Sequence, residues 1–211
     1  MSALLDLLPL ILIVIIIIAI VVMFVPKLAA QKKVEDTIQN IAKKHDIQTL
    51  WNALNSQLVK LHEIGQYQEA SKIAEEALKS VKEIHGNDHL QVATIANNLA
   101  ALYRGQARLT EAEPLFKEAI NIWEKNLGKE SIEVASGINN LADVYSSQNK
   151  YSEAEALYKQ ALEIFEKVYG KEHPNIVTIM ENMVALYKKT GNTTKATILE
   201  EKARLIKAKI T

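Results

Sequence analysis

The stretch "NNLA" occurs at Asn97–Ala100 and again, unchanged, at Asn139–Ala142. The two copies set an offset of 42 residues, and Ala, Tyr and Gly recur at the same offset elsewhere in the chain. Self-similarity at a fixed period of this length is the signature of a repeat architecture. The recurring positions are Ala70, Ala112, Ala154 and Ala196; Ala77, Ala119, Ala161 and Ala203; Tyr103, Tyr145 and Tyr187; and Gly86, Gly128 and Gly170.

Each 42-residue unit predicts two helices. In the second unit, apolar residues at spacings of three and four predict one helix from about Gln91 to Arg104 and another from about Thr110 to Asn126. The two matched Ala positions lie seven apart on one face of the second helix, where small side chains let neighbouring helices approach closely. Three of the four breaks between paired helices carry Gly or Asn, which tolerate the left-handed conformation that ends a helix. The breaks fall on Gly65, Ala107, Asn149 and Gly191.

On these residues the chain resembles the tetratricopeptide repeat family, in its 42-residue form like that of kinesin light chains. The resemblance covers Asp46 to Thr211 and implies an all-α solenoid of four helix-turn-helix repeats. The outer repeats depart from the family pattern at Gln57 and Leu58, and at Val184 and Glu200. The repeats are expected at about 46–87, 88–129, 130–171 and 172–211. The family's Leu, small residue, Tyr, Ala, aromatic and Ala fall on Leu99, Ala100, Tyr103, Ala112, Phe116 and Ala119, and then on Leu141, Ala142, Tyr145, Ala154, Tyr158 and Ala161.

The N-terminal segment differs in character from the repeats. Residues 7–26 carry no charge, and as a helix they would span about the 30 Å of a hydrocarbon core, which predicts a single transmembrane helix in contact with the lipid bilayer. A cleaved signal peptide fits less well because no basic residue precedes the span. Lys27, Lys32 and Lys33 follow it, so we expect a single-pass membrane protein with cytoplasmic repeats. Residues 1–26 are thus the expected anchor, and 27–45 an amphipathic linker or capping helix.

The composition narrows the function classes. The 25 basic and 25 acidic residues cancel and are interspersed, which argues against nucleic acid as a partner. No nucleotide-binding glycine loop, nucleophile elbow or zinc-binding His pair is present, so neither an enzyme nor a cofactor is expected. His85 and His89 are four apart, but Gly86 interrupts the helix between them, and we expect no metal site there.

The repeated Asn pair points to a binding surface. On a helical wheel Ala96, Leu99 and Ala100 share one side, while Asn97 and Asn98 lie on the other. The resemblance implies that this other side lines a concave groove holding partner segments, and an Asn side chain can both donate to and accept from an extended peptide. Alternatively, these side chains bridge successive helices. The expected groove residues are Asn55, Thr94, Asn97, Asn98, Ala101, Arg104, Ser136, Asn139, Asn140, Asp143, Thr178, Glu181 and Asn182.

Together these observations favour a membrane-anchored scaffold or adaptor that recruits a protein partner through the groove. The alternative is a structural or assembly subunit of a larger membrane complex, or a repeat scaffold that self-assembles as a homo-oligomer. The sequence does not decide between the two, because repeat scaffolds share one core pattern across unrelated functions.

Overall fold

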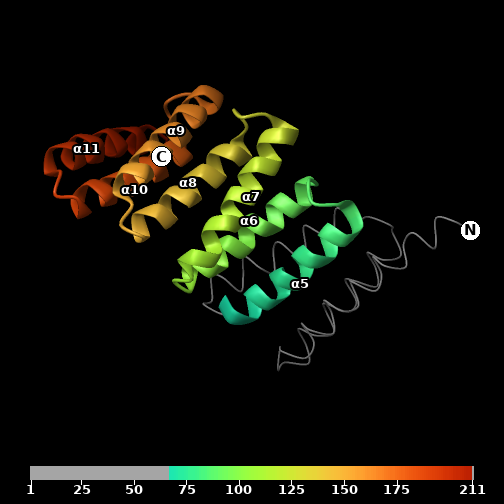
Figure 1. Cartoon of the computed structure of the whole chain (residues 1–211). Coiled ribbons are helices and arrows are strands. Elements are labelled where there is room, and N and C mark those ends of the chain that lie inside the picture. The colour runs from blue at the N-terminus through green and yellow to red at the C-terminus, as the bar shows by residue number, and fades with distance from the viewer. Residues whose placement is uncertain (1–66, 211) are drawn as a thin grey trace, which may run out of the picture. The chain divides into compact units, whose positions relative to one another are not determined.

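The computed structural model describes residues 67–210, which form seven α-helices and no strand (Figure 1). The helices divide into two compact units between Ala107 and Arg108, and each unit is described by itself. The predicted anchor at 1–26, the linker at 27–45 and Asn55 lie outside the described residues. The first unit contains α5 (Tyr67–His85) and α6 (Leu90–Gly105), and the second contains α7 (Leu109–Leu127), α8 (Ile132–Ser147), α9 (Tyr151–Tyr169), α10 (Pro174–Lys189) and α11 (Thr193–Ile210).

The expected membrane localisation requires correction. Among residues 67–210, no helix combines the length and the apolar character needed to cross a bilayer. The segment that prompted the expectation, 7–26, is outside this part of the chain. Nothing in the structure supports a single-pass membrane protein, and that prediction is wrong.

The helical pairs follow the predicted pattern closely. The predicted helices at about Gln91–Arg104 and Thr110–Asn126 are observed at Leu90–Gly105 and Leu109–Leu127. In the second unit each helix packs against the next, and α8 also contacts α10, which is the arrangement of a helical repeat. The all-α helical repeat fold is therefore confirmed for the described residues.

The turns between paired helices have the predicted backbone. Ala107, Asn149 and Gly191 all have positive φ, at 58°, 63° and 72°. Asn and Gly adopt this left-handed conformation readily, whereas Ala does so at a cost of roughly 1 kcal/mol. The repeat geometry therefore imposes the turn even where the residue disfavours it.

The recurring Ala positions form the centre of the packing. All eight are buried, and the six on α5, α7 and α9 have no exposed surface. A further small residue, Gly137 on α8, was not predicted from the sequence. A Cβ atom placed on it would lie 2.8 Å from Ile120 Cγ1 and 3.1 Å from the Trp123 ring. The absence of a side chain at position 137 therefore lets α8 lie directly against the bulky residues of α7.

The starts of α6, α8 and α10 are capped from one repeat position. Ser131 Oγ accepts a hydrogen bond from the backbone N–H of Val134. At the equivalent positions His89 and His173 cap their helices through Nδ1. Pro174 follows in the first turn of α10, where its missing N–H costs little. The "HGNDH" and "KEHPN" stretches therefore have a structural role in helix initiation.

Candidate functional site

The predicted groove residues all lie at the surface of α6, α8 and α10, apart from Asn55. The five on α6 are half-buried, as are the four on α8 and Asn182 on α10. Thr178 and Glu181 are exposed. The structure brings together the residues of α8 and α10. Those of α6 belong to the other compact unit and are not placed relative to them. We call the side of α8 and α10 that carries Asn139, Asn140 and Asn182 the amide face.

Two Asn side chains bridge α8 and α10. The Asn182 side-chain nitrogen donates to Asn139 Oδ1 at 3.3 Å. The bridging role that the sequence left open is therefore realised for this pair. A primary amide offers two donors and two acceptor lone pairs, so the bridge uses only part of the capacity of each side chain. On α6, Asn97 donates within the helix to Asn98, at 3.5 Å.

The charged residues beside the amide face are held by neighbouring helices. The Tyr158 hydroxyl on α9 donates to Asp143 at 2.5 Å. Glu181 pairs with Lys207 of α11 at 3.4 Å, and the next basic residue on α10, Lys188, pairs with Glu200 at 3.1 Å. Such exposed pairs are weak, but they reduce the net charge presented next to the amides. The face therefore offers mainly neutral hydrogen-bonding groups.

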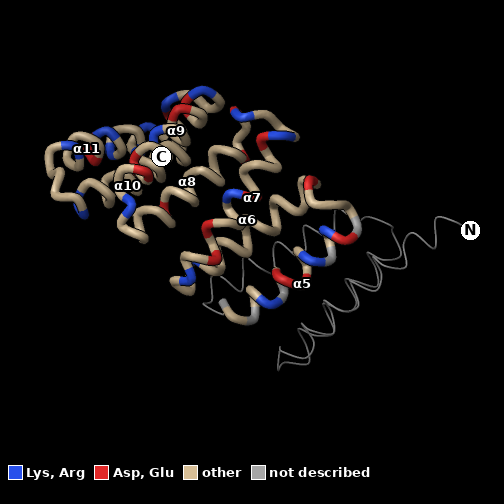
Figure 2. The backbone as a smooth tube through the Cα atoms, viewed as in Figure 1, with Lys and Arg blue, Asp and Glu red and all other residues tan. Residues whose placement is uncertain are grey.

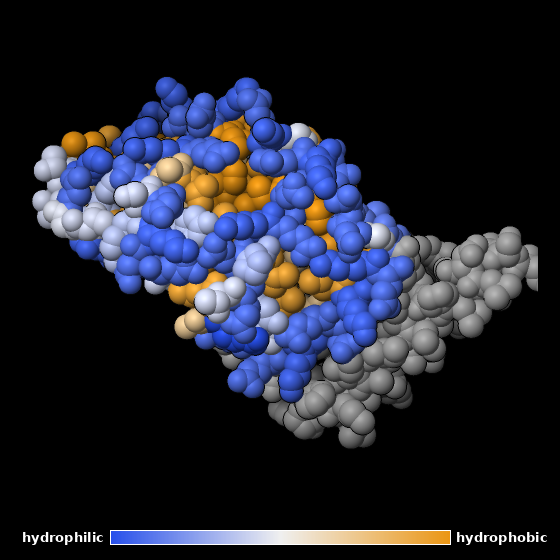
Figure 3. All heavy atoms as spheres, viewed as in Figure 1, coloured by the Kyte–Doolittle hydropathy of each residue, from blue (hydrophilic) through white to orange (hydrophobic). Residues whose placement is uncertain are grey.

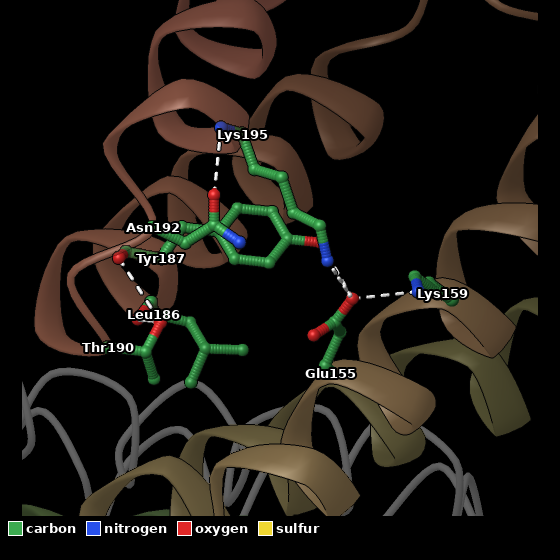
Figure 4. Close-up of polar contacts among 7 residues, drawn as sticks. All are labelled: Glu155, Lys159, Leu186, Tyr187, Thr190, Asn192 and Lys195. Atoms are coloured by element: carbon green, nitrogen blue, oxygen red, sulfur yellow. Dashed lines mark hydrogen bonds and ion pairs between the residues drawn. The ribbon is translucent and has the colours of Figure 1, made fainter.

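The partly buried carboxylate of Glu155 on α9 joins three helices (Figure 4). Lys159 and Lys195 approach its carboxylate at 2.7 and 3.2 Å, and the Tyr187 hydroxyl donates to it at 3.0 Å. Asn192 accepts from the Lys195 backbone N–H at 3.2 Å, which caps the first turn of α11. Sequence reasoning missed this cluster.

These contacts shift the pKa values of Glu155 and Tyr187. Lys159 first, and then Lys195 and Tyr187, lower the pKa of Glu155 from 4.5 to about 2, against the opposing effect of partial burial. Burial, and then the Glu155 charge, raise the pKa of Tyr187 to about 12. Both groups therefore keep one protonation state across the physiological range, as expected of a structural contact rather than an acid–base catalyst.

The same contact recurs one repeat earlier. Glu113 on α7 binds Lys117 at 2.7 Å, and the Tyr145 hydroxyl donates to it at 3.3 Å. Lys117 first, with Gln148 and Lys150, lowers the pKa of Glu113 to about 2. The 42-residue offset places Glu113 with Glu155, Lys117 with Lys159 and Tyr145 with Tyr187. That alignment was the signal from which the sequence could have revealed these contacts.

No other chemistry stands out between residues 67 and 210. Basic and acidic side chains are scattered over the helices, with neither sign gathered on one helix (Figure 2). This part of the chain holds no group of three His, Asp or Glu side chains arranged to bind a metal ion. What these residues do show is a set of bridging contacts between repeats and a polar face on α8 and α10.

The fold and the sequence are both similar to those of known helical repeat proteins. The fold is an all-α helical repeat of the kind that serves as a scaffold for protein–protein interaction. The tetratricopeptide repeat model matches at residues 58–125, 91–167 and 133–207, and the chain belongs to this family of typically non-enzymatic scaffolds. The sequence has no significant match among curated proteins.

Solved structures share the fold. BtubC (BKLC) from P. vanneervenii is 26% identical, with a TM-score of 0.72, over 86% of this chain and 72% of its own. A putative kinesin light chain with nearly identical TPR-like repeats from Podosopora anserina is 22% identical, with a TM-score of 0.64, over 87% of this chain and 88% of its own. The apo form of RapI is 18% identical, with a TM-score of 0.68, over 87% of this chain and 65% of its own.

Proposed function

We propose that the chain is a scaffold that recruits another protein by binding an extended segment of it on the amide face of α8 and α10. The observation that supports this most strongly is the hydrogen bond between Asn182 and Asn139. It fixes two half-buried amides next to each other on neighbouring helices while leaving hydrogen-bonding capacity on both. A segment bound there would place its backbone N–H and C=O groups against pre-oriented partners, which lowers the entropy cost of binding.

The surroundings indicate what such a segment would look like. Asp143 and Glu181 flank the amides, and each already has a partner on α9 or α11. Lys207 offsets the charge of Glu181 and the Tyr158 hydroxyl satisfies one oxygen of Asp143, so the amides would supply most of the new contacts through main-chain recognition. This favours an internal, extended stretch of a partner over a charged chain terminus.

The test begins with purification of the full-length chain from its source and identification of the protein that accompanies it. Binding of that protein is then measured by titration calorimetry with the double variant Asn139→Ala, Asn182→Ala. Two lost amides should weaken binding by roughly tenfold or more, at about 1 kcal/mol for each hydrogen bond. Asn121→Ala is the matched control, because Asn121 is exposed on α7, away from the amide face.

Circular dichroism of each variant separates recognition from folding. The double variant should keep its helical signal, because the amides are not part of the apolar core. Unchanged affinity of the double variant for the partner would contradict the proposal. Equal weakening in the double variant and in Asn121→Ala would sink it too.

A further inference from the structure

The second unit has an edge formed by the C-terminal ends of α7, α9 and α11 together with the loops 128–131 and 170–173, here called the loop edge. Two ion pairs show that these parts are adjacent. Lys167, in the last turn of α9, pairs with Glu130 in the first loop. Lys209, in the last turn of α11, pairs with Glu172 in the second loop at 2.5 Å. The loop edge is therefore continuous across three successive repeats.

Large apolar side chains are exposed along this edge. Leu127 is 42% exposed, Val168 44%, Tyr169 39% and Ile210 38%. Leu127 and Tyr169 occupy the same position in successive repeats, so the exposure recurs. Figure 3 shows more generally that, on the face in view, apolar residues reach the surface between hydrophilic ones. Exposed apolar groups that cluster, rather than occur singly, mark surfaces that another molecule covers.

Tyr169 is held in place as an aromatic anchor. Its ring stacks on His173, with centroids 3.9 Å apart and planes 4° from parallel, and lies 6.0 Å from the Phe165 ring centroid. His173 is itself fixed, because its Nδ1 accepts from the Asn175 backbone N–H. The Tyr169 hydroxyl has no hydrogen-bond partner among the described residues. A rigid, partly exposed Tyr is the kind of side chain that dominates binding energy at interfaces.

The charges on the edge are not balanced. Glu130 and Glu172 each pair with a lysine from a neighbouring helix end. Lys129 and Lys171, which follow the glycines at the helix ends, are exposed, and no acid among residues 67–210 pairs with them. Glu124 at the end of α7 and Glu133 at the start of α8 also have no ion-pair partner among residues 67–210, so the positive charge of the loop edge is uncompensated at Lys171, beside Tyr169.

We propose that the loop edge is a second docking surface and that its occupant is a segment of another protein that combines acidic with apolar side chains. The apolar groups would cover Leu127, Val168 and Tyr169, and the carboxylates would meet Lys129 and Lys171. An anionic lipid surface fits less well, because electrostatic membrane binding generally takes four to eight basic residues.

The proposal is tested with full-length protein and a fluorescently labelled 12-residue peptide that alternates Leu or Phe with Asp or Glu. Anisotropy titrations should show binding that weakens about tenfold in Lys129→Glu, Lys171→Glu, because charge reversal replaces attraction with repulsion. Tyr169→Ser should weaken it similarly. The matched control is Lys150→Glu, Lys189→Glu, which makes the same change in net charge at exposed positions at the start of α9 and the end of α10, the helix ends opposite the loop edge, and should bind as the wild type does.

Two further probes decide between occupants. A peptide with every acid replaced by Lys should not bind, and vesicles of mixed anionic and neutral lipid should not sediment with the protein. Absence of binding by the acidic peptide up to about 1 mM overturns the proposal, since the weakest specific contacts register in that range. Equal binding by the Lys peptide, loss of binding in the control variant, or vesicle binding that depends on Lys129 and Lys171 overturns it as well. The Asn139→Ala, Asn182→Ala variant should still bind, which separates this edge from the amide face.

Discussion

Helices α9 and α11 occupy the same place in successive repeats but are held in different ways. Helix α9 packs between α8 and α10 and buries Tyr158, Ile164 and Phe165 besides two alanines. Helix α11 packs on α10 and buries only Ala196, Ala203 and Ile206. At the positions of Tyr158 and Phe165 it has Glu200 and Lys207. Helix α11 therefore keeps the small residues of α9 but has charged residues in place of its two buried aromatic residues.

Ion pairs take over part of the attachment of α11. Lys195 pairs with Glu155 of α9 and Lys207 with Glu181 of α10. Exposed pairs of this kind contribute about 0–1 kcal/mol each, whereas a buried aromatic residue contributes several times more. We therefore expect α11 to open locally before the rest of the second unit. The other pairs are Lys202–Glu166, Lys209–Glu172 and Lys188–Glu200.

The largest predicted effect comes from removing an apolar contact of α9. Phe165→Ala should lower the free energy of unfolding by about 3–5 kcal/mol, because Phe165 is buried and its removal leaves a cavity. Ile206→Ala on α11 should cost about 2 kcal/mol. Urea unfolding followed by circular dichroism measures both. Equal losses would show that α11 is anchored as firmly as α9.

A smaller effect is expected from acid, through the carboxylate that links α9 to α11. The folded pKa of Glu155 is about 2, below its ordinary 4.5, so its stabilising effect is complete above pH 4.5 and disappears as the pH falls towards 2. We expect about 1–2 kcal/mol, after allowance for solvent screening. The difference in unfolding free energy between the wild type and Glu155→Gln should therefore shrink as the pH falls through this range. A constant difference would contradict the assignment.

Gly137→Ala tests how closely α8 packs against α7 in the interior of the second unit. The new methyl group would lie 2.8 Å from Ile120 Cγ1, and the resulting strain should exceed the helix propensity that Ala adds, for a net loss of about 1 kcal/mol. Adding Ile120→Ala should relieve the clash, so the two substitutions should be non-additive in thermal or urea unfolding. Simple additivity would mean that contact with Ile120 is not the source of the strain at position 137.

The smallest effect concerns salt. Raising the ionic strength to about 1 M shortens the screening length to about 3 Å and should weaken the ion pairs of α11 by a few tenths of a kcal/mol each. Amide hydrogen exchange in α11 should then accelerate a few-fold, while exchange in α9 stays unchanged. An equal response of both helices would remove the distinction between them.

The sequence predicted the repeated elements well because their signals are local. The helix ends around Leu90 and Leu127, the left-handed turns and the buried alanines all follow from spacing and residue type. Ala107 is instructive, because its residue type argues against the turn that the repeat period predicts. Periodicity outweighed local preference there, as expected when tertiary packing decides.

The candidate site was less predictable because its contacts join distant residues. The surface positions of Asn139 and Asn182 followed from the helical wheel, but their mutual hydrogen bond depends on how α8 and α10 approach each other. The contact of Asp143 with Tyr158 depends on a side-chain rotamer that no spacing specifies. Two of the partners of Glu155, Tyr187 and Lys195, are 32 and 40 positions away. Only alignment of the repeats could have suggested it.

The missing side chain at position 137 has a consequence for how this sequence can change over generations. Position 137 corresponds by the repeat to Ile179, and Trp123 to Phe165, so the repeat with the larger ring carries the smaller partner. Mutational drift at either site is therefore constrained by the other. Descendant sequences that acquire a branched residue at 137 should also carry a slimmer one at 123, and a survey of natural variants would reveal this as correlated substitution.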